Sequence, residues 1–152
     1  MKLVLADAEA TTALGAALAR ILARRAGAVL FLHGDLGAGK TTLARGVLRA
    51  LGVTGTIRSP TYTLIEPYSA AGCELLHMDL YRLQDPEELH QLGLIDYPPE
   101  RTVWLVEWPE RAGNLLPQPD ISIVLSRSEN ARNVELTGLS AEEAESLLAQ
   151  LA

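Results

Sequence analysis

The chain has 152 residues, of which 48% are hydrophobic, and its formal net charge is −6 at pH 7. This length suits one domain over residues 1–152 with a proper buried core, and the negative charge argues against a protein that grips nucleic acid through a broad basic surface. No apolar run approaches the roughly 18 residues of a membrane helix, and the N-terminal residues lack the basic start and apolar core of a signal peptide. A single cysteine, Cys73, excludes an internal disulfide and suits a reducing compartment. We therefore expect a cytoplasmic protein without a membrane segment.

The first residues predict a strand followed by a helix. Residues 2–5 suit a short edge strand. Asp7 is a suitable N-cap for a helix over residues 8–25, whose apolar positions recur at helical spacing. Gly27 is expected to close this helix as its C′ residue.

Residues 34–42 read Gly-Asp-Leu-Gly-Ala-Gly-Lys-Thr-Thr, between an apolar run over 28–33, expected to be a central strand, and a helix pattern over 40–51. They match the G-x-x-x-x-G-K-[ST] pattern of a phosphate-binding loop. Glycines let backbone N–H groups converge on a phosphate, and the next helix directs its partial positive charge there. Lys40 suits the β- and γ-phosphates, and the Thr41 hydroxyl suits Mg²⁺. A glycine-rich turn that binds nothing is the alternative, but it would not need the strand, the helix, the lysine and the threonine together. The residues predicted to bind nucleotide here are Asp35, Leu36, Gly37, Ala38, Gly39, Lys40, Thr41 and Thr42.

An irregular connection leads from this helix to two more strands. Residues 61–66 alternate like a strand that Pro67 stops, a turn is expected at 70–72, and a second strand at 74–79. Residues 59–63, Ser-Pro-Thr-Tyr-Thr, lie where the connection enters the sheet. Nucleotide hydrolases often use such a segment to sense the γ-phosphate, and an ordinary polar loop is the alternative. The residues of this switch-like loop are Ser59, Thr61 and Thr63.

Asp79 ends an apolar strand, as a carboxylate that holds Mg²⁺ beside a phosphate loop would. The alternatives for Asp79 are an N-cap or a salt bridge to Arg82. His77 shares one face of the strand with Asp79, and this pattern favours a core histidine over a ligand.

A second carboxylate, Glu107, comes near the end of another buried strand predicted over residues 102–108. It suits orienting or deprotonating a water, or supporting a metal, whereas a helix-initiating acid ahead of Pro109 is the alternative. Trp108 would either wall the site from water or cap the core. Before this strand, residues 85–93 predict a short helix with an aspartate N-cap and a proline at its first position.

The C-terminal part predicts strands over residues 120–126 and 132–137. Ser140 and Glu143 form a capping-box pattern that opens a last amphipathic helix. The chain thus alternates helices with six or seven strands. We predict an α/β, P-loop NTPase-like three-layer fold with a small mixed sheet flanked by helices.

Five segments together carry a family resemblance. They are residues 34–42, Ser59-Pro-Thr-Tyr-Thr-Leu64, His77-Met-Asp-Leu-Tyr-Arg82, Asp85-Pro-Glu-Glu-Leu89 and Val106-Glu-Trp-Pro109. In order and spacing they resemble the bacterial TsaE family (older name YjeE), the small ATPases of tRNA threonylcarbamoyladenosine synthesis. The similarity runs from about Asp7 to Thr137. Met78 stands where the family usually has an aromatic residue, which should change packing rather than chemistry.

The resemblance implies ATP and Mg²⁺ as cofactors and the TsaD and TsaB proteins as partners. Those partners transfer threonylcarbamoyl to adenosine 37 of tRNA, whereas the family member hydrolyses ATP to reset the complex. Contact with tRNA would belong mainly to the partner complex, and self-association stays open.

The resemblance also implies roles for single residues. Lys40 would act on phosphates, Thr41 and Glu107 near Mg²⁺, and Asp79 as the acidic residue of the site. The catalytic residues would then be Lys40, Asp79 and Glu107, with Thr41, Glu107 and Asp79 as metal ligands. Which carboxylate lies nearer the metal is open. Thr11 and Arg132 correspond to regions near the adenine.

Three functions other than ATP hydrolysis are compatible with a phosphate-binding loop. A small-molecule kinase shares the phosphate loop but needs an arginine-rich lid, and residues 83–100 are too acidic and proline-rich for that. A GTPase lacks support because no Asn-Lys-x-Asp sequence occurs. A nucleotide-gated binding module, in which ATP orders residues 52–63 and hydrolysis is incidental, is the non-enzymatic alternative.

Overall fold

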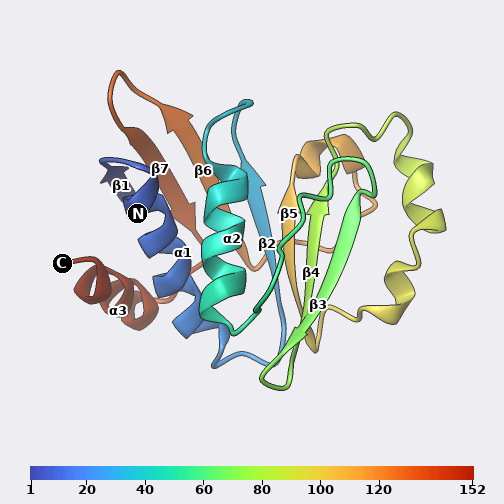
Figure 1. Cartoon of the computed structure of the whole chain (residues 1–152), viewed down its shortest axis with the longest axis horizontal. Helices are drawn as coiled ribbons and strands as arrows, with labels where there is room; N and C mark the ends of the chain where they lie inside the picture. Colours follow the sequence, from blue (N-terminus) through green and yellow to red (C-terminus); the bar gives the residue numbers. More distant parts are fainter.

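The computed structural model describes residues 1–152, which build one seven-stranded mixed sheet with helices against its faces (Figure 1). The strands are β1 (Lys2–Leu5), β2 (Ala28–His33), β3 (Ile65–Ala70), β4 (Cys73–Asp79), β5 (Thr102–Glu107), β6 (Ile121–Arg127) and β7 (Arg132–Thr137). The helices are α1 (Ala8–Leu22), α2 (Lys40–Ala50) and α3 (Ala141–Leu151), with short 3₁₀ helices η1 (Pro86–Gln91), η2 (Leu94–Asp96) and η3 (Pro109–Ala112). The α/β class predicted from the sequence is confirmed.

The strand order is β1-β7-β6-β2-β5-β4-β3, and its centre is parallel. β2 pairs in parallel with β5 and β6, and β5 with β4, whereas β1, β7 and β3 are joined antiparallel. The carboxyl ends of β2, β4 and β5 therefore meet at one edge of the sheet, where α2 also begins. In open α/β sheets such an edge is where ligands bind.

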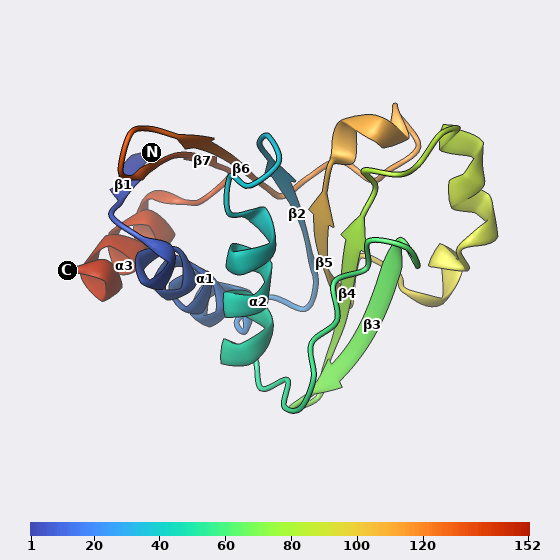
Figure 2. The same ribbon diagram turned by 45° about the horizontal axis from the view of Figure 1, so that its top comes forward.

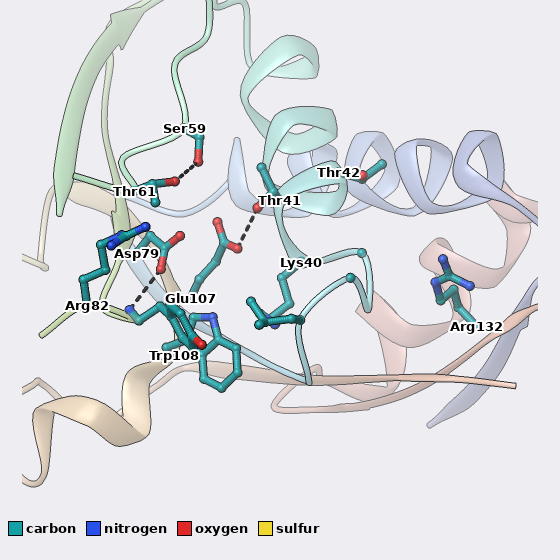
Figure 3. A pocket seen from close by; sticks show the side chains of 14 residues that line it. Lys40, Thr41, Thr42, Ser59, Thr61, Asp79, Arg82, Glu107, Trp108 and Arg132 are labelled. Atoms are coloured by element: carbon teal, nitrogen blue, oxygen red, sulfur yellow. Dashed lines mark hydrogen bonds between the residues drawn. The ribbon is translucent and has the colours of Figure 1, made fainter. Parts of the chain in front are cut away.

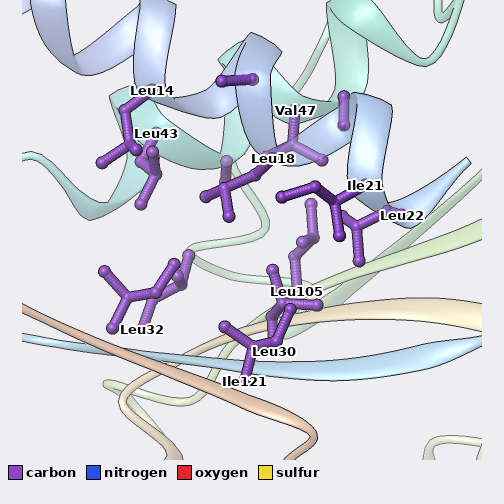
Figure 4. Close-up of a cluster of buried hydrophobic side chains, with 14 of the residues drawn as sticks. Leu14, Leu18, Ile21, Leu22, Leu30, Leu32, Leu43, Val47, Leu105 and Ile121 are labelled. Carbon is purple, nitrogen blue, oxygen red and sulfur yellow. The ribbon is translucent and has the colours of Figure 1, made fainter. Parts of the chain in front are cut away.

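The two faces of the central sheet are covered differently. α1 and α2 lie side by side on one face, as Figures 1 and 2 show, and α3 packs beside α1. Their apolar side chains meet alternate residues of β2, such as Leu30 and Leu32, in the main core. Val29 points to the other face, where it belongs to a second cluster with apolar side chains from residues 76–116. Because successive side chains of a strand point to opposite faces, a central strand must be apolar throughout. The labelled side chains of the main core in Figure 4 are Leu14, Leu18, Ile21, Leu22, Leu30, Leu32, Leu43, Val47, Leu105 and Ile121.

The first helix is shorter than its sequence pattern predicts. Asp7 caps α1 as expected, its side chain accepting from the N–H of Ala10, but the helix ends at Leu22 rather than at residue 25. The C′ role predicted for Gly27 is therefore wrong. A Cβ at Gly27 would collide with the carbonyl of Pro99, so this glycine is required by close packing against the loop before β5.

The strand predicted over residues 61–66 is displaced. β3 begins at Ile65, runs through Pro67 and ends at Ala70. Proline does not stop it because β3 is the sheet edge, pairing only with β4, and an edge strand tolerates one missing N–H. Residues 61–64 form a turn instead, in which the Leu64 N–H donates to the Pro60 carbonyl (2.9 Å) and Leu64 has a φ of 67°.

Several other predictions are confirmed. The turn between β3 and β4 is a two-residue hairpin at Ala71 and Gly72, both with positive φ. Both residues of the predicted capping box, Ser140 and Glu143, close their hydrogen bonds at the start of α3. The segment after Asp85 is helical but of the tighter 3₁₀ type. As to membranes, every helix is too short or too polar to span a bilayer.

Candidate functional site

A cavity of about 430 Å³ opens where the parallel strands end and α2 begins (Figure 3). Four separate segments converge on it: the loop after β2, the connection before β3, and the residues at and after the ends of β4 and β5. Arg132 from β7 reaches the same space. The lining residues are Leu36, Gly37, Gly39, Lys40, Thr41, Thr42, Ser59, Thr61, Asp79, Tyr81, Arg82, Glu107, Trp108 and Arg132.

The loop over residues 34–39 turns the chain from β2 into α2. Gly39 is the N-cap residue of α2 with a φ of 111°, a conformation that L side chains rarely adopt. No side chain caps this helix, so its first backbone N–H groups are left for another acceptor. An uncapped helix start beside a cavity is the arrangement that binds anions.

Lys40 is buried, with 5% exposure. Its Nζ donates to the carbonyl oxygens of Gly34 and Asp35, the latter at 2.9 Å, and lies 4.3 Å from the Trp108 ring centroid. Burial lowers the pKa of Lys40, and the carboxylates around it, Glu107 foremost, oppose that shift. The ammonium group is thus held under the loop by carbonyl oxygens and an aromatic face.

Glu107 is bound on both sides by other side chains. Its Oε1 accepts a hydrogen bond from the Thr41 hydroxyl at 2.8 Å, and its Oε2 lies 2.6 Å from Nε2 of His77. Glu107 is 2% exposed and His77 fully buried. A carboxylate at the end of β5 is therefore tied both to the first turn of α2 and to the interior of β4.

Asp79 lies directly opposite Glu107 in the parallel ladder of β4 and β5. Its Oδ1 accepts from the backbone N–H of Tyr81 at 3.0 Å. Burial is the largest cause that raises the pKa of Asp79; the nearby Glu107 adds to it, and the Tyr81 N–H opposes it. Arg82 forms no ion pair with Asp79, and its guanidinium lies 4.6 Å from the centroid of the Tyr62 ring.

The connection before β3 brings two of the three predicted loop hydroxyls to the cavity. Ser59 Oγ and Thr61 Oγ1 lie 2.8 Å apart and both line it. Thr63 is exposed and does not line the cavity. The turn over residues 61–64 separates the two threonines, which a continuous strand would have placed on one face.

Thr11 and Arg132, predicted to lie near the adenine, line a second hollow next to the cavity. This hollow of about 230 Å³ is lined by Thr11, Gly39, Thr42 and Arg132, among others. Because Arg132 lines both hollows, the two are adjacent. Of the predicted loop residues, Asp35 and Ala38 line neither hollow.

Sequence reasoning did not assign Tyr81, Arg82 or His77 to the site, although the fold brings all three to it or next to it. Tyr81 packs against Trp108 with ring centroids 4.9 Å apart, and Arg82 lines the cavity. Both lie within three residues after Asp79, so their position after a strand end was a usable signal. His77 carried a weaker one, its alternation with Asp79 on one strand face.

Comparison with known proteins decides the family. The model of the family described as "Threonylcarbamoyl adenosine biosynthesis protein TsaE" matches residues 5–134. The chain belongs to the TsaE family. This confirms the resemblance drawn from the five sequence segments.

Individual TsaE relatives are similar over most of the chain. The protein named tRNA threonylcarbamoyladenosine biosynthesis protein TsaE from Haemophilus influenzae is 49% identical over 108 residues, 71% of this chain and 68% of that protein. The protein of the same name from Nostoc sp. is 41% identical over 143 residues, 90% of this chain and 85% of that protein. The crystal structure of Bacillus subtilis YdiB superposes with a TM-score of 0.76 and 34% identity, covering 99% of this chain and 93% of that one. The P-loop fold predicted for this TsaE chain is thus confirmed.

Proposed function

We propose that this TsaE-family chain is a Mg²⁺-dependent ATPase that supports the TsaD–TsaB complex in forming threonylcarbamoyladenosine at position 37 of tRNA, without carrying out the transfer itself. One observation carries the proposal: the lysine and threonine of a phosphate loop share one cavity with two carboxylates from adjacent strand ends. The TsaE name of the relatives supports the pathway.

The loop side of the cavity would bind the triphosphate. The uncapped start of α2 offers backbone N–H groups, and Lys40 offers the charge that phosphates need. The adjoining hollow, lined by Thr11 and Arg132, would take the adenosine part of ATP. ATP would then cross from one hollow to the other over Gly39.

The oxygen atoms present fit Mg²⁺. Mg²⁺ is usually held by one or two protein oxygens together with substrate phosphates and water, and the Thr41 hydroxyl and the carboxylates of Asp79 and Glu107 line the cavity. The Thr41 hydroxyl donates a hydrogen bond to Glu107, which leaves the lone pairs of its oxygen for a cation. Bound Mg²⁺ would neutralise charge on the phosphates.

The carboxylate side would carry out hydrolysis. Glu107 holds the Thr41 hydroxyl, and Asp79 lines the cavity beside it. We assign Glu107 to the metal side on this contact and Asp79 to orienting the attacking water. Ser59 and Thr61 would sense the γ-phosphate from the same side of the cavity as Asp79, and Trp108 would limit the access of water.

The test is ATP hydrolysis by the purified chain, alone and with TsaD, TsaB and tRNA. We expect low turnover alone, a marked rise with the complex, and no turnover for Lys40→Ala under either condition. Appreciable turnover that the complex leaves unchanged would contradict the coupling, and phosphate transfer to an added acceptor would then favour a kinase. ATP binding that promotes assembly without turnover would favour a nucleotide-gated binding module.

A further inference from the structure

A fully buried histidine lies behind the carboxylate of Glu107. His77 sits in β4, and its Nε2 is 2.6 Å from Oε2 of Glu107. Its sequence pattern favoured a histidine that merely fills the core. The contact connects this side chain to the cavity through one intermediate residue.

We propose that His77 is a positioning residue, whose Nε2–H fixes the Glu107 carboxylate so that the other carboxylate oxygen holds the Thr41 hydroxyl. The proposal rests on the ATPase function proposed above and adds to it a residue that does not line the cavity. His77 touches neither nucleotide nor metal in this arrangement.

The surroundings of the imidazole decide which nitrogen carries the proton. Nδ1 of His77 is buried and has no hydrogen-bond partner. A proton there would be an unpaired buried donor, whereas a proton on Nε2 meets an acceptor-only carboxylate at hydrogen-bond distance. Of the two tautomers, the one with its proton on Nε2, which donates to Glu107, therefore suits these surroundings.

Packing alone gives no reason for a histidine at this position. The side chains of Leu75, two residues before it on the same strand face, and of Leu105, opposite it in β5, belong to the main core. An aliphatic side chain at residue 77 would fill such a place without burying a polar atom that lacks a partner. The hydrogen bond to Glu107 is the feature that only a donor can supply.

The consequence reaches the first turn of α2. Glu107 is held at Oε2 by His77 and at Oε1 by Thr41, at 2.6 and 2.8 Å. With both oxygens engaged, its carboxyl group cannot turn about its last bond without losing a hydrogen bond. The hydroxyl hydrogen of Thr41 therefore stays directed at Glu107, and the lone pairs of its oxygen remain available to a cation. Partners of this kind behind a metal site typically change metal affinity or activity about 10–100-fold.

The test compares His77→Leu, which removes the donor, with His77→Gln, which keeps an N–H. Leu105→Val, a core change directly opposite in the ladder, is the matched control. We expect His77→Leu to lower kcat, or raise the Mg²⁺ concentration for half-maximal turnover, about 10–100-fold, while KM for ATP changes little. His77→Gln should recover most of the loss. Equal losses for His77→Leu and Leu105→Val, or no loss for His77→Leu, would overturn the proposal.

A double mutant separates positioning from general support of the fold. If His77 acts through Glu107, adding His77→Leu to Glu107→Ala should reduce turnover by less than about twofold further. Multiplication of the two single effects would show that His77 acts independently of Glu107, and would overturn the proposal.

A third readout needs no nucleotide. The ¹⁵N and ¹H signals of the His77 ring, assigned by their loss in His77→Gln, should show the neutral Nε2–H tautomer at neutral pH. An Nδ1–H tautomer would overturn the hydrogen bond. Failure of the unaltered chain to bind ATP would instead overturn the proposed function, so the two failures can be told apart.

Discussion

The cavity has two walls that are made in different ways. One wall is a continuous stretch, residues 34–42, which forms its turn and opens α2 by itself. The other wall gathers Ser59, Asp79 and Glu107 from three segments that only the sheet order brings together. The first wall offers N–H groups and a cation, and the second offers hydroxyls and carboxylates. Binding and hydrolysis should therefore be separable by substitutions on either wall.

The largest effect is expected on the continuous wall. Lys40→Ala removes the buried cation beside the proposed phosphate site, so we expect nucleotide affinity to fall about 100-fold or more. Titration calorimetry with ATP and Mg²⁺ measures this, with Lys2→Ala, the other lysine of the chain, as the control. Unchanged affinity would show that both walls do not serve one nucleotide site.

The next largest effect is expected for the wall formed by Ser59, Asp79 and Glu107. Glu107→Ala should lower kcat about 100-fold and change the Kd for ATP less than about fivefold, since the Mg²⁺ that Glu107 is proposed to support would neutralise charge that develops mainly in the transition state. Steady-state turnover and equilibrium binding on one preparation separate the two quantities. Glu100→Ala, an exposed acid before the opposite end of β5, is the control. A loss of binding equal to the loss of turnover would remove the distinction between the walls.

A smaller effect concerns the contribution of Asp79, in the second wall, to the stability of the folded chain. Burial raises the pKa of Asp79 in the folded chain, so its ionised form opposes folding above that pKa, and the penalty fades as the pH falls through it. Asp79→Asn keeps an acceptor for the Tyr81 N–H and removes the charge. Without nucleotide we expect its Tm to exceed that of the unaltered chain by about 2–4 °C at pH 7–8, which corresponds to about 1 kcal/mol.

That difference should shrink as the pH falls towards 4, because Asp79 then becomes protonated in the unaltered chain as well. Asp96→Asn, at an exposed acid in η2, is the control for a simple change of net charge. A lower Tm for Asp79→Asn at pH 7–8 would mean that the Asp79 charge stabilises the empty site.

The smallest effect lies away from both walls. Glu143 at the start of α3 forms a two-pronged ion pair with Arg25, which lowers the pKa of Glu143 together with the Ser140 N–H. Its stabilisation is present at neutral pH and is lost as the pH falls below about 4.3 and through the lowered value. Both side chains are partly exposed, so solvent screens the pair, and we expect Glu143→Gln to cost about 0.5–1 kcal/mol of unfolding free energy.

Thermal unfolding at pH 7 and pH 3.5 measures this cost, with Glu142→Gln as the control. ATP affinity and turnover should not change. A Glu143→Gln variant with altered turnover would show that the site depends on α3 as well as on its two walls.

The sequence predicted well whatever depends on neighbours along the chain. The strand before the phosphate loop, the cap of α1 at Asp7 and the capping box at Ser140 appear where their patterns place them. The positions of Asp79 and Glu107 at the ends of strands were likewise predictable, because each residue follows an apolar run. These features are decided by side-chain period and by hydrogen bonds within a few residues.

The predictions failed where a segment distant in sequence decides the role of a residue. Pro67 was predicted to end a strand, but β3 continues through it because β3 lies at the edge of the sheet. Gly27 reads as a helix cap, but the loop at Pro99 requires its missing side chain. Thr63 reads as a partner of Thr61, but a turn with a left-handed Leu64 separates them.

The sequence by itself determined that this chain has a phosphate loop between a strand and a helix, in the TsaE pattern, because that wall is built from consecutive residues. Only the tertiary structure decided that Glu107 meets Thr41 on one side and His77 on the other. Those contacts span 66 and 30 residues of chain. They exist because β4 and β5 are neighbours in the sheet and α2 begins above their ends, a pairing order that no local pattern specifies.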